Sequence, residues 1–348
     1  MIKIIIITFT AFLFLVNCSG NNITNPEPEP GRRDYVWTID TLDISAPAYF
    51  IWGSSPFDVW VTTAADFNHS LWHYNGSDWS TDGIFRFILP KAIWGFSSDN
   101  IYIGGSAGKI WKYNGSDWSE NVVMQKDGHG VGVQSIWGES KNDFYAMGAS
   151  PDEQGYFNNS VIAHYKNNNW TMLNTDGLKG LVVHMFRNNP DKRIYLLVSK
   201  IGGIEHADST LIYECTGGTY NKIYSSIENM GYQADIRLIN QEVYFILGDT
   251  IAKRKDNQFQ TFLNVENPKF YQRIWGRSSK DIFLLMTDGL AHYNGDNIEY
   301  LIYFKYPDSS PLTQIYDAAI FEKEVFFTTD EPPTYLEYIY HGILLESE

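Results

Sequence analysis

Short hydrophobic runs recur along most of the chain, and small polar turn residues separate them. The phrase "IWG" begins at Ile51, Ile93, Ile136 and Ile274, and each copy leads through a Gly-, Ser- and Asp-containing link to a run such as "DVWVTT" or "NIYIGG". A second phrase, "LWHYNGSDW" or "IWKYNGSDW", then follows, and its Asn-Gly pair is a strong hairpin signal. The pattern predicts units of four short antiparallel strands joined by turns.

The spacing of these units identifies the architecture. The first three copies begin 42 and 43 residues apart, a period typical of four-stranded propeller blades. Weaker copies begin near Val182, Asp235 and Ile315. We therefore predict an all-β fold, a seven-bladed β-propeller of four-stranded antiparallel blades over residues 34–348.

The last unit lacks a fourth strand, and the beginning of the domain can supply it. Trp37 precedes Ile51 by fourteen residues, the same interval that separates Trp79 from Ile93. Residues 35–43 are therefore predicted to pair with the C-terminal blade and close the ring, which would remove its unpaired edges.

The repeated phrases resemble the bacterial secreted propeller repeats of the form W-G-x-S-x-x-D-V-W-x-V-G, followed by G-x-I-x-H-Y-N-G-x-x-W. The resemblance covers residues 35–348 and implies the propeller fold. The family is defined by that fold, so the resemblance implies no particular activity.

The N-terminus indicates an envelope protein. A basic Lys3 precedes an apolar run too short to span a bilayer, so residues 1–17 are predicted to be a signal peptide. The "LVNC" that ends the run resembles the lipobox of bacterial lipoproteins, which implies lipidation of Cys18 and anchoring in the bacterial cell envelope, with the outer membrane as the expected location. The alternative is a plain secretory signal. Residues 18–33 contain Pro and Glu but few apolar residues, and we expect them to form a flexible tether.

Composition limits the classes of partner. The net charge of −15 disfavours nucleic acids and anionic lipid headgroups, so membrane contact is expected through the lipid alone. Only Cys215 remains beside Cys18, so no internal disulfide is expected in the mature chain. We expect a monomer without a cofactor.

Long loops are the best candidates for a binding site, because tight turns leave no room for one. The links at 63–70, 149–160 and 200–210, together with the Gly-rich link at 125–134, belong to the first four units and should lie on one face. Their candidate ligand-binding residues are Asp66, His69, Asp127, His129, Asp152, Glu153, Tyr156, Phe157, Glu205, His206 and Asp208. Solvated loops without a partner are the alternative.

Other conspicuous residues follow the repeat and are predicted to be structural. His73, His164 and His292 share one slot of the unit, and equivalent residues of different blades are too far apart to share a metal. The eleven tryptophans also follow the repeat, so most should be blade core.

The chain has none of the common catalytic motifs, so no catalytic residue is assigned. The sequence favours a binding or scaffold module for a protein or an envelope glycan. A carbohydrate-active enzyme or glycan-uptake subunit, and a purely structural envelope component, are the alternatives.

Overall fold

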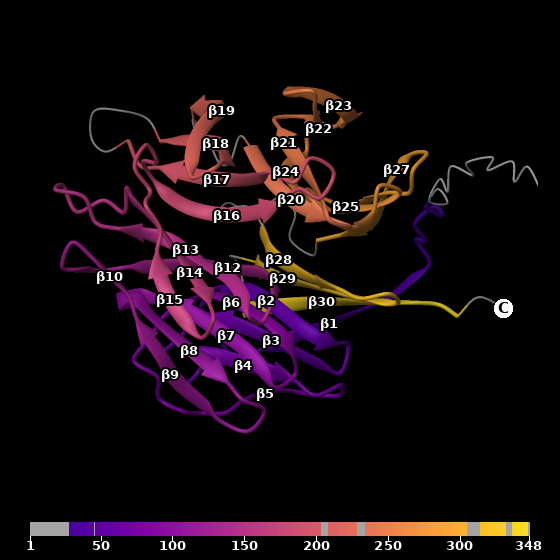
Figure 1. Cartoon of the computed structure of the whole chain (residues 1–348). Coiled ribbons are helices and arrows are strands. Elements are labelled where there is room, and N and C mark those ends of the chain that lie inside the picture. The colour runs from indigo at the N-terminus through magenta and orange to yellow at the C-terminus, as the bar shows by residue number, and fades with distance from the viewer. Residues whose placement is uncertain are drawn as a thin grey trace, which may run out of the picture.

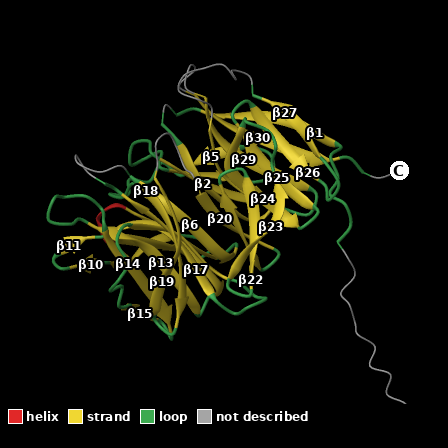
Figure 2. Cartoon of the chain, turned by 90° about the horizontal axis from the view of Figure 1, so that it is seen from above, coloured by secondary structure: helices red, strands yellow, loops and turns green. Residues whose placement is uncertain are grey.

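The computed structural model describes residues 28–44, 46–202, 208–227, 234–304, 314–331 and 336–346. These residues form seven four-stranded antiparallel sheets arranged in a ring (Figure 1). Almost all of the described chain is strand or loop (Figure 2). The seven-bladed propeller predicted from the repeat is confirmed, including the weakly repetitive fourth, fifth and seventh units. No helix among the described residues is long and apolar enough to cross a membrane.

The strands follow the chain in order, four to a blade. Blade 1 consists of β2 (Ala48–Ser55), β3 (Asp58–Thr63), β4 (Leu71–Tyr74) and β5 (Trp79–Thr81), and blade 2 of β6 (Pro90–Ser97), β7 (Asn100–Gly105), β8 (Lys109–Tyr113) and β9 (Trp118–Val123). Blade 3 consists of β12 (Gly132–Ser140), β13 (Asp143–Ser150), β14 (Asn159–Lys166) and β15 (Asn169–Met172), and blade 4 of β16 (Leu181–Arg187), β17 (Ile194–Lys200), β18 (Ser209–Thr216) and β19 (Thr219–Ile227). Blade 5 consists of β20 (Ala234–Ile239), β21 (Glu242–Leu247), β22 (Thr250–Lys255) and β23 (Gln258–Asn264), and blade 6 of β24 (Phe270–Ser278), β25 (Asp281–Met286), β26 (Gly289–Tyr293) and β27 (Ile298–Tyr303).

Blade 7 joins the two ends of the chain. It contains β28 (Gln314–Ile320), β29 (Glu324–Glu331) and β30 (Leu336–Leu344), and β1 (Tyr35–Leu42) is its outer strand. The register of β1 and β30 runs from Tyr35 opposite Leu344 to Leu42 opposite Glu337. Figure 1 shows this indigo strand beside the yellow one. The predicted closure by an N-terminal strand is confirmed.

The repeated Trp-Gly pair interlocks neighbouring blades. A Cβ atom on Gly95 of β6 would lie only 2.5 Å from the ring of Trp52, which belongs to the preceding blade. Glycine at this position therefore leaves the space that the neighbouring tryptophan fills. All eleven tryptophans lie in the described residues and none is exposed, which confirms their assignment to the core.

The repeated histidines bond carboxylates of their own blades. The Nε2 atoms of His73, His164 and His292 lie 2.8, 2.7 and 2.8 Å from carboxylate oxygens of the strand beside them; the partners are Asp58, Asp143 and Asp281. The described residues contain no group of three or more His, Cys, Asp or Glu side chains that could hold a metal ion. Each of these histidines thus links the third strand of its blade to the second.

The two faces of the ring differ in their connections. The links between first and second strands, and between third and fourth strands, share one face. The other two kinds of link share the opposite face, here called the loop-rich face. It also carries the short hairpin of β10 (Gln125–Lys126) and β11 (His129–Gly130) and a 3-10 turn, η1 (Ser106–Gly108). The first strand of every blade begins at the loop-rich face.

Contacts with the propeller begin upstream of β1. The backbone N–H of Gly31 donates to the carbonyl of Lys280 at 2.7 Å, and Arg33 donates to the carbonyl of His292 at 2.9 Å. Arg33 also forms an ion pair with Glu299 at 2.9 Å. Residues 31–33 are thus attached to blade 6.

Candidate functional site

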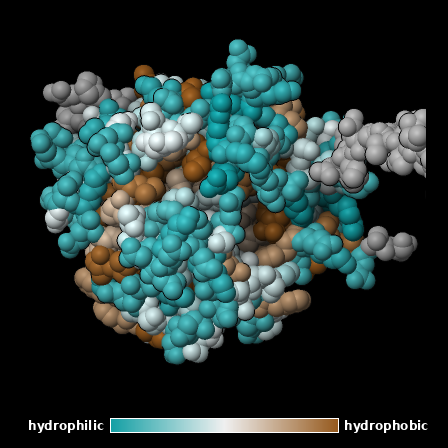
Figure 3. Space-filling view, viewed as in Figure 1, coloured by the Kyte–Doolittle hydropathy of each residue, from teal (hydrophilic) through white to brown (hydrophobic). Residues whose placement is uncertain are grey.

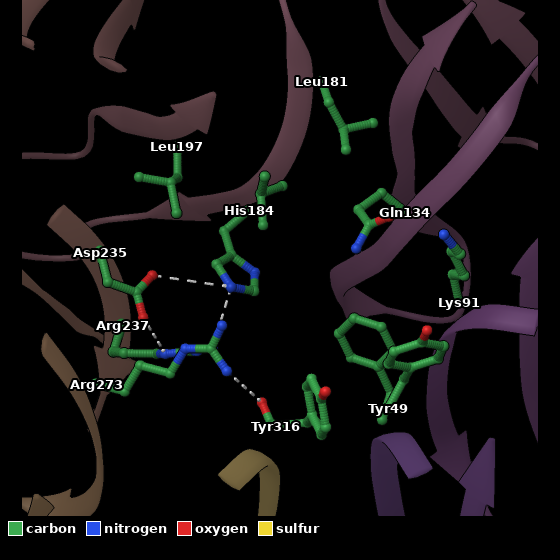
Figure 4. Close-up of a pocket in the computed structure, with 12 residues that line it drawn as sticks. Tyr49, Lys91, Gln134, Leu181, His184, Leu197, Asp235, Arg237, Arg273 and Tyr316 are labelled. Atoms are coloured by element: carbon green, nitrogen blue, oxygen red, sulfur yellow. Dashed lines mark hydrogen bonds and ion pairs between the residues drawn. The ribbon is translucent and has the colours of Figure 1, made fainter. Parts of the chain in front are cut away.

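A cavity of about 320 Å³ lies on the axis of the ring. The first strands of all seven blades contribute to its lining, which consists of Tyr49, Phe50, Lys91, Gln134, Leu181, Val183, His184, Leu197, Asp235, Arg237, Arg273 and Tyr316. The first-strand residues occupy the first four positions of their strands, so the cavity lies toward the loop-rich face. We call it the channel site (Figure 4).

The lining is positively charged although the chain is acidic. The lining contains three cationic side chains, those of Lys91, Arg237 and Arg273, and one carboxylate, that of Asp235. The whole chain, by contrast, carries a net charge of −15. Hydrophilic residues cover most of the face of the molecule that Figure 3 shows, with hydrophobic residues in the recesses between them. A cationic recess inside an acidic molecule attracts and selects anions.

A buried network organises one wall of the channel site. Arg237 Nε lies 2.9 Å from Asp235 Oδ2, close enough for an ion pair but outside hydrogen-bonding geometry, and Arg237 Nη1 lies 3.1 Å from His184 Nε2. The Arg237 guanidinium also lies over the ring of Trp275, 5.6 Å from its centroid. The Asp235 side chain is only 5% exposed, so its charge depends on these neighbours.

Burial controls protonation in this network. Burial raises the pKa of Asp235 above its usual value, although Arg237 and Arg273 act in the opposite direction. The pKa of His184 lies well below its usual value because of burial and the two guanidinium groups. His184 is therefore neutral at pH 7.

The contact with Arg237 also determines the tautomer of His184. Arginine can only donate, so Nε2 of His184 must accept and the ring proton must lie on Nδ1. Nδ1 has no hydrogen-bond partner among the described residues. In Figure 4 the His184 ring points into the space between the two walls, where its N–H can donate to a ligand.

The opposite wall adds a cation and an amide. Lys91 is exposed and has no ion-pair partner within the described part of the chain, and its Nζ lies 5.9 Å from the ring centroid of Tyr49. The side chain of Gln134 lies on the same side and likewise has no partner there (Figure 4). Tyr49 packs edge-to-face on Tyr316, with 5.4 Å between ring centroids, which joins blades 1 and 7.

A smaller cavity of about 110 Å³ adjoins the channel site and shares Phe50, His184 and Arg237 with it. It also contains Asp317, whose Oδ2 lies 3.4 Å from the backbone nitrogen of Ile51. Burial raises the pKa of Asp317, and the positive charge of Arg237 opposes this increase. Arg237 therefore stabilises carboxylates on two sides.

The arrangement suits the recognition of a carboxylate. Guanidinium, ammonium, amide and imidazole N–H groups are all donors, and charge-assisted hydrogen bonds to carboxylates are stronger than neutral ones. The acidic groups that could act as general bases are engaged, since Asp235 is paired with Arg237 and Asp317 accepts from the backbone.

The predicted loop residues that the structure describes lie on the loop-rich face, and several of them organise their own loops. Asp66 accepts from the backbone N–H groups of Asn68 and His69 and lies 2.9 Å from the His69 ring. These hydrogen bonds lower the pKa of Asp66 below its usual value. Asp152 accepts from the backbone of Gln154 and Tyr156 in the same way.

The other predicted residues are more dispersed. Asp127, His129, Glu153 and Phe157 are exposed, and Tyr156 is half-buried. Asp208 accepts from the backbone of Gly202 at 2.8 Å. Glu205, His206 and Cys18 lie outside the described residues. No hydrogen bond or ion pair within the described segments joins predicted residues of different loops, so a site shared by these loops stays a prediction.

The channel residues were not among the sequence-predicted candidates, although the repeat contained a signal for them. Tyr49, Lys91 and Gln134 each stand two positions before the isoleucine of "IWG", in the strand nearest the axis. Chemically different side chains at one position of a repeat, on a strand facing the axis, indicate a channel lining. Asp235 and Arg237 come from a blade where the phrase is lost.

Comparison with known proteins supports the fold. No protein-family model matches the chain, and no curated protein matches it. Solved structures that resemble it include YCF48 bound to D1 peptide (TM-score 0.62, 13% identity, 92% of this chain and 100% of that chain). Others are a catalytically inactive virginiamycin B lyase from Staphylococcus aureus with quinupristin (0.61, 12%, 89% and 100%) and the WD40 β-propeller domain of Doa1 (0.57, 10%, 87% and 96%). At these identities the likeness shows the fold alone.

Proposed function

We propose that the protein is a binding module of the bacterial cell envelope that captures a partner protein or envelope glycan on its loop-rich face. A carboxylate of the partner enters the channel site. The observation that carries this proposal is the convergence of Lys91, Arg237 and Arg273 on one cavity of an otherwise acidic chain.

Preorganisation supports binding at this position. The cations come from three blades of a closed ring, and Arg273 is held by the carbonyl of Ile315 at 3.0 Å. Such groups lose little conformational entropy when a ligand binds. The solved structure of YCF48 bound to D1 peptide is an example of a peptide bound to a protein of similar fold.

The cellular setting is also proposed. The apolar run before Cys18 and the Pro- and Glu-containing residues that follow support a signal peptide, a lipid anchor and a tether. This arrangement would hold the propeller close to an envelope membrane, with the loop-rich face available to a partner.

A calorimetric titration with matched probes tests the proposal. The probes are an amidated Gly-Ser-Glu repeat peptide and a galacturonic acid trisaccharide, each compared with a neutral counterpart containing glutamine or galactose. At least one anionic probe should bind, with affinity that falls as salt is added, and the neutral probes should not. Equal binding of charged and neutral probes, or no binding of either anionic probe, would refute the proposal.

Two lysine variants locate the binding site. Lys91→Glu should lower the affinity for the anionic probe by about tenfold to a hundredfold, since a charge-assisted hydrogen bond contributes about 1.5–3 kcal/mol to binding. Lys255→Glu makes the same change of charge at an exposed lysine on the opposite face and should bind like the wild type. Equal effects of the two variants would place the site outside the channel.

A further inference from the structure

An exposed apolar ridge lies on the loop-rich face, on the link between β5 and β6 that leads to Lys91 of the channel site. It consists of Ile84, Phe85, Phe87 and Leu89, residues that are 51%, 60%, 61% and 40% exposed. Phe67, from the loop between β3 and β4, packs against it, with ring centroids 5.3 Å from Phe85 and 5.0 Å from Phe87. Clustered exposed apolar side chains mark interaction surfaces.

The outward orientation of the ridge is fixed by the residues that alternate with it. Arg86 and Ile88 point inward and are 1% and 0% exposed. Arg86 donates to Asp82 at 3.0 Å and lies 5.8 and 5.7 Å from the ring centroids of Trp111 and Trp118. A buried arginine therefore occupies the inner side while the phenylalanines face outward, the reverse of an ordinary amphipathic segment.

Backbone hydrogen bonds hold the same segment against its neighbours. The N–H of Arg86 donates to the carbonyl of Phe67 at 3.2 Å, and Leu89 exchanges hydrogen bonds with Ser106 at 3.0 and 3.1 Å. The ridge is consequently preformed, so little conformational entropy is lost in ordering it when a ligand binds.

A short stretch of chain joins the ridge to the channel site. Lys91, which lines the cavity, follows Phe87 by four residues, which span at most about 14 Å of extended chain. A ligand strand advances by about 3.3 Å per residue, so three to five of its residues cover that distance.

We infer that the channel ligand is a polypeptide segment whose carboxylate enters the cavity and whose apolar side chain, three to five residues away, docks on the apolar ridge. This inference rests on the proposed function and narrows the partner to a protein.

The chemistry of the ridge favours a polypeptide over the other candidates. Its side chains are hydrocarbons without hydrogen-bonding groups, so the hydroxyls of a glycan would lose water there without a replacement partner. A bilayer surface would have to meet the exposed carboxylates of Asp66, Asp127 and Glu153 on the same face, whereas a single chain can pass between them.

Selection from a library of random twelve-residue peptides displayed on phage tests the inference with the purified full chain. The wild type should enrich peptides in which Asp or Glu stands three to five residues from Phe, Leu, Ile or Met. A labelled consensus peptide, measured by fluorescence anisotropy, should bind the double variant Phe85→Ser/Phe87→Ser at least about tenfold more weakly. Phe57→Ser removes an equally exposed phenylalanine, 66% exposed, from the opposite face and should leave the affinity unchanged. Circular dichroism checks that each variant is folded.

The alternative outcomes distinguish the two proposals. Enriched peptides that are acidic without an apolar preference, and that bind the double variant normally, would overturn the inference and leave the carboxylate site standing. Binding of the galacturonate probe without any enriched peptide would make the partner a glycan. Flotation with phosphatidylglycerol vesicles that depends on Phe85 and Phe87 would make the ridge a membrane contact. No ligand in any format would overturn both proposals.

Discussion

Replacing Arg237 with methionine should reveal how strongly the channel network depends on one cation. The guanidinium lies 2.9 Å from Asp235 and 3.1 Å from His184, and it opposes the raised pKa of Asp317. Arg237→Met keeps most of the side-chain volume and removes the charge. Asp235, whose side chain is only 5% exposed, would then be buried without its closest cation.

We expect Arg237→Met to lower the unfolding free energy by a large amount. Removing one partner of a buried ion pair costs about 3–5 kcal/mol of unfolding free energy, and the burial of Asp235 leaves little solvent screening to reduce it. The double variant Asp235→Asn/Arg237→Met removes both charges and should recover the part of this loss that comes from Asp235, whereas Asp317 still lacks the cation. The effect of the double variant on the unfolding free energy, minus the sum of the two single effects, therefore measures the interaction between these two buried charges.

The loss should also depend on pH in a defined direction. Burial already raises the pKa of Asp235, and removing Arg237 takes away an interaction that lowers it. A carboxyl whose folded-state pKa is raised favours folding when it is protonated, and this contribution is lost as pH rises through that pKa. Urea unfolding should therefore show a smaller difference from the wild type at pH 5 than at pH 8. A difference below about 1 kcal/mol at pH 8, or one equal at both pH values, would refute the reasoning.

Three further predictions follow from other parts of the fold. A chain beginning at residue 46 lacks β1 and should melt at a much lower temperature or aggregate, whereas a chain beginning at residue 28 should not; equal melting would contradict the closure. Burial acts to raise the pKa of Asp281, but the hydrogen bond with His292 and the charge of Arg277 lower it overall, so this stabilisation is present above about pH 4 and lost as pH falls through the lowered pKa. Asp281→Asn should reduce the loss of unfolding free energy between pH 4 and pH 2, and an unchanged acid profile would refute this role. Cys18→Ser should move the chain from the membrane fraction to the soluble fraction and abolish incorporation of a labelled fatty acid; persistent labelling would show that Cys18 is not the modified residue.

The blade architecture could be predicted because it depends on local pattern. Each "IWG" phrase, its link and the turn between the third and fourth strands lie within one unit of some forty residues, and the interval from Trp37 to Ile51 repeats that from Trp79 to Ile93. Strand pairing and ring closure are consequences of this periodicity.

The channel site could not be predicted in the same way because ring closure assembles it. Lys91 and Arg237 are 146 positions apart in the sequence and lie in blades 2 and 5, yet they line one cavity. Arg237 also belongs to a blade whose repeat has diverged, so aligning the sequences of the repeat units does not identify it as a residue of the channel lining. The pairing with Asp235 is local, but its burial depends on the whole ring.

The apolar ridge illustrates a different limit. Five of the six residues in the run "IFRFIL" are apolar, a composition typical of a buried segment. The structure instead buries the one arginine and exposes both phenylalanines, since Asp82 and two tryptophans accommodate Arg86. This inversion depends on tertiary contacts that a hydrophobicity pattern does not contain.

Nuclear magnetic resonance of the ¹⁵N-labelled histidine rings, recorded while the Gly-Ser-Glu peptide is added, tests the central claim most directly. The free protein at pH 7 should show His184 neutral with its proton on Nδ1, and the His184 signal should shift with this peptide but not with the Gly-Ser-Gln counterpart. His69 and His129 lie on the loops, so their signals report the alternative location. A charged His184, or shifts at His69 and His129 while His184 stays unchanged, would contradict binding in the channel.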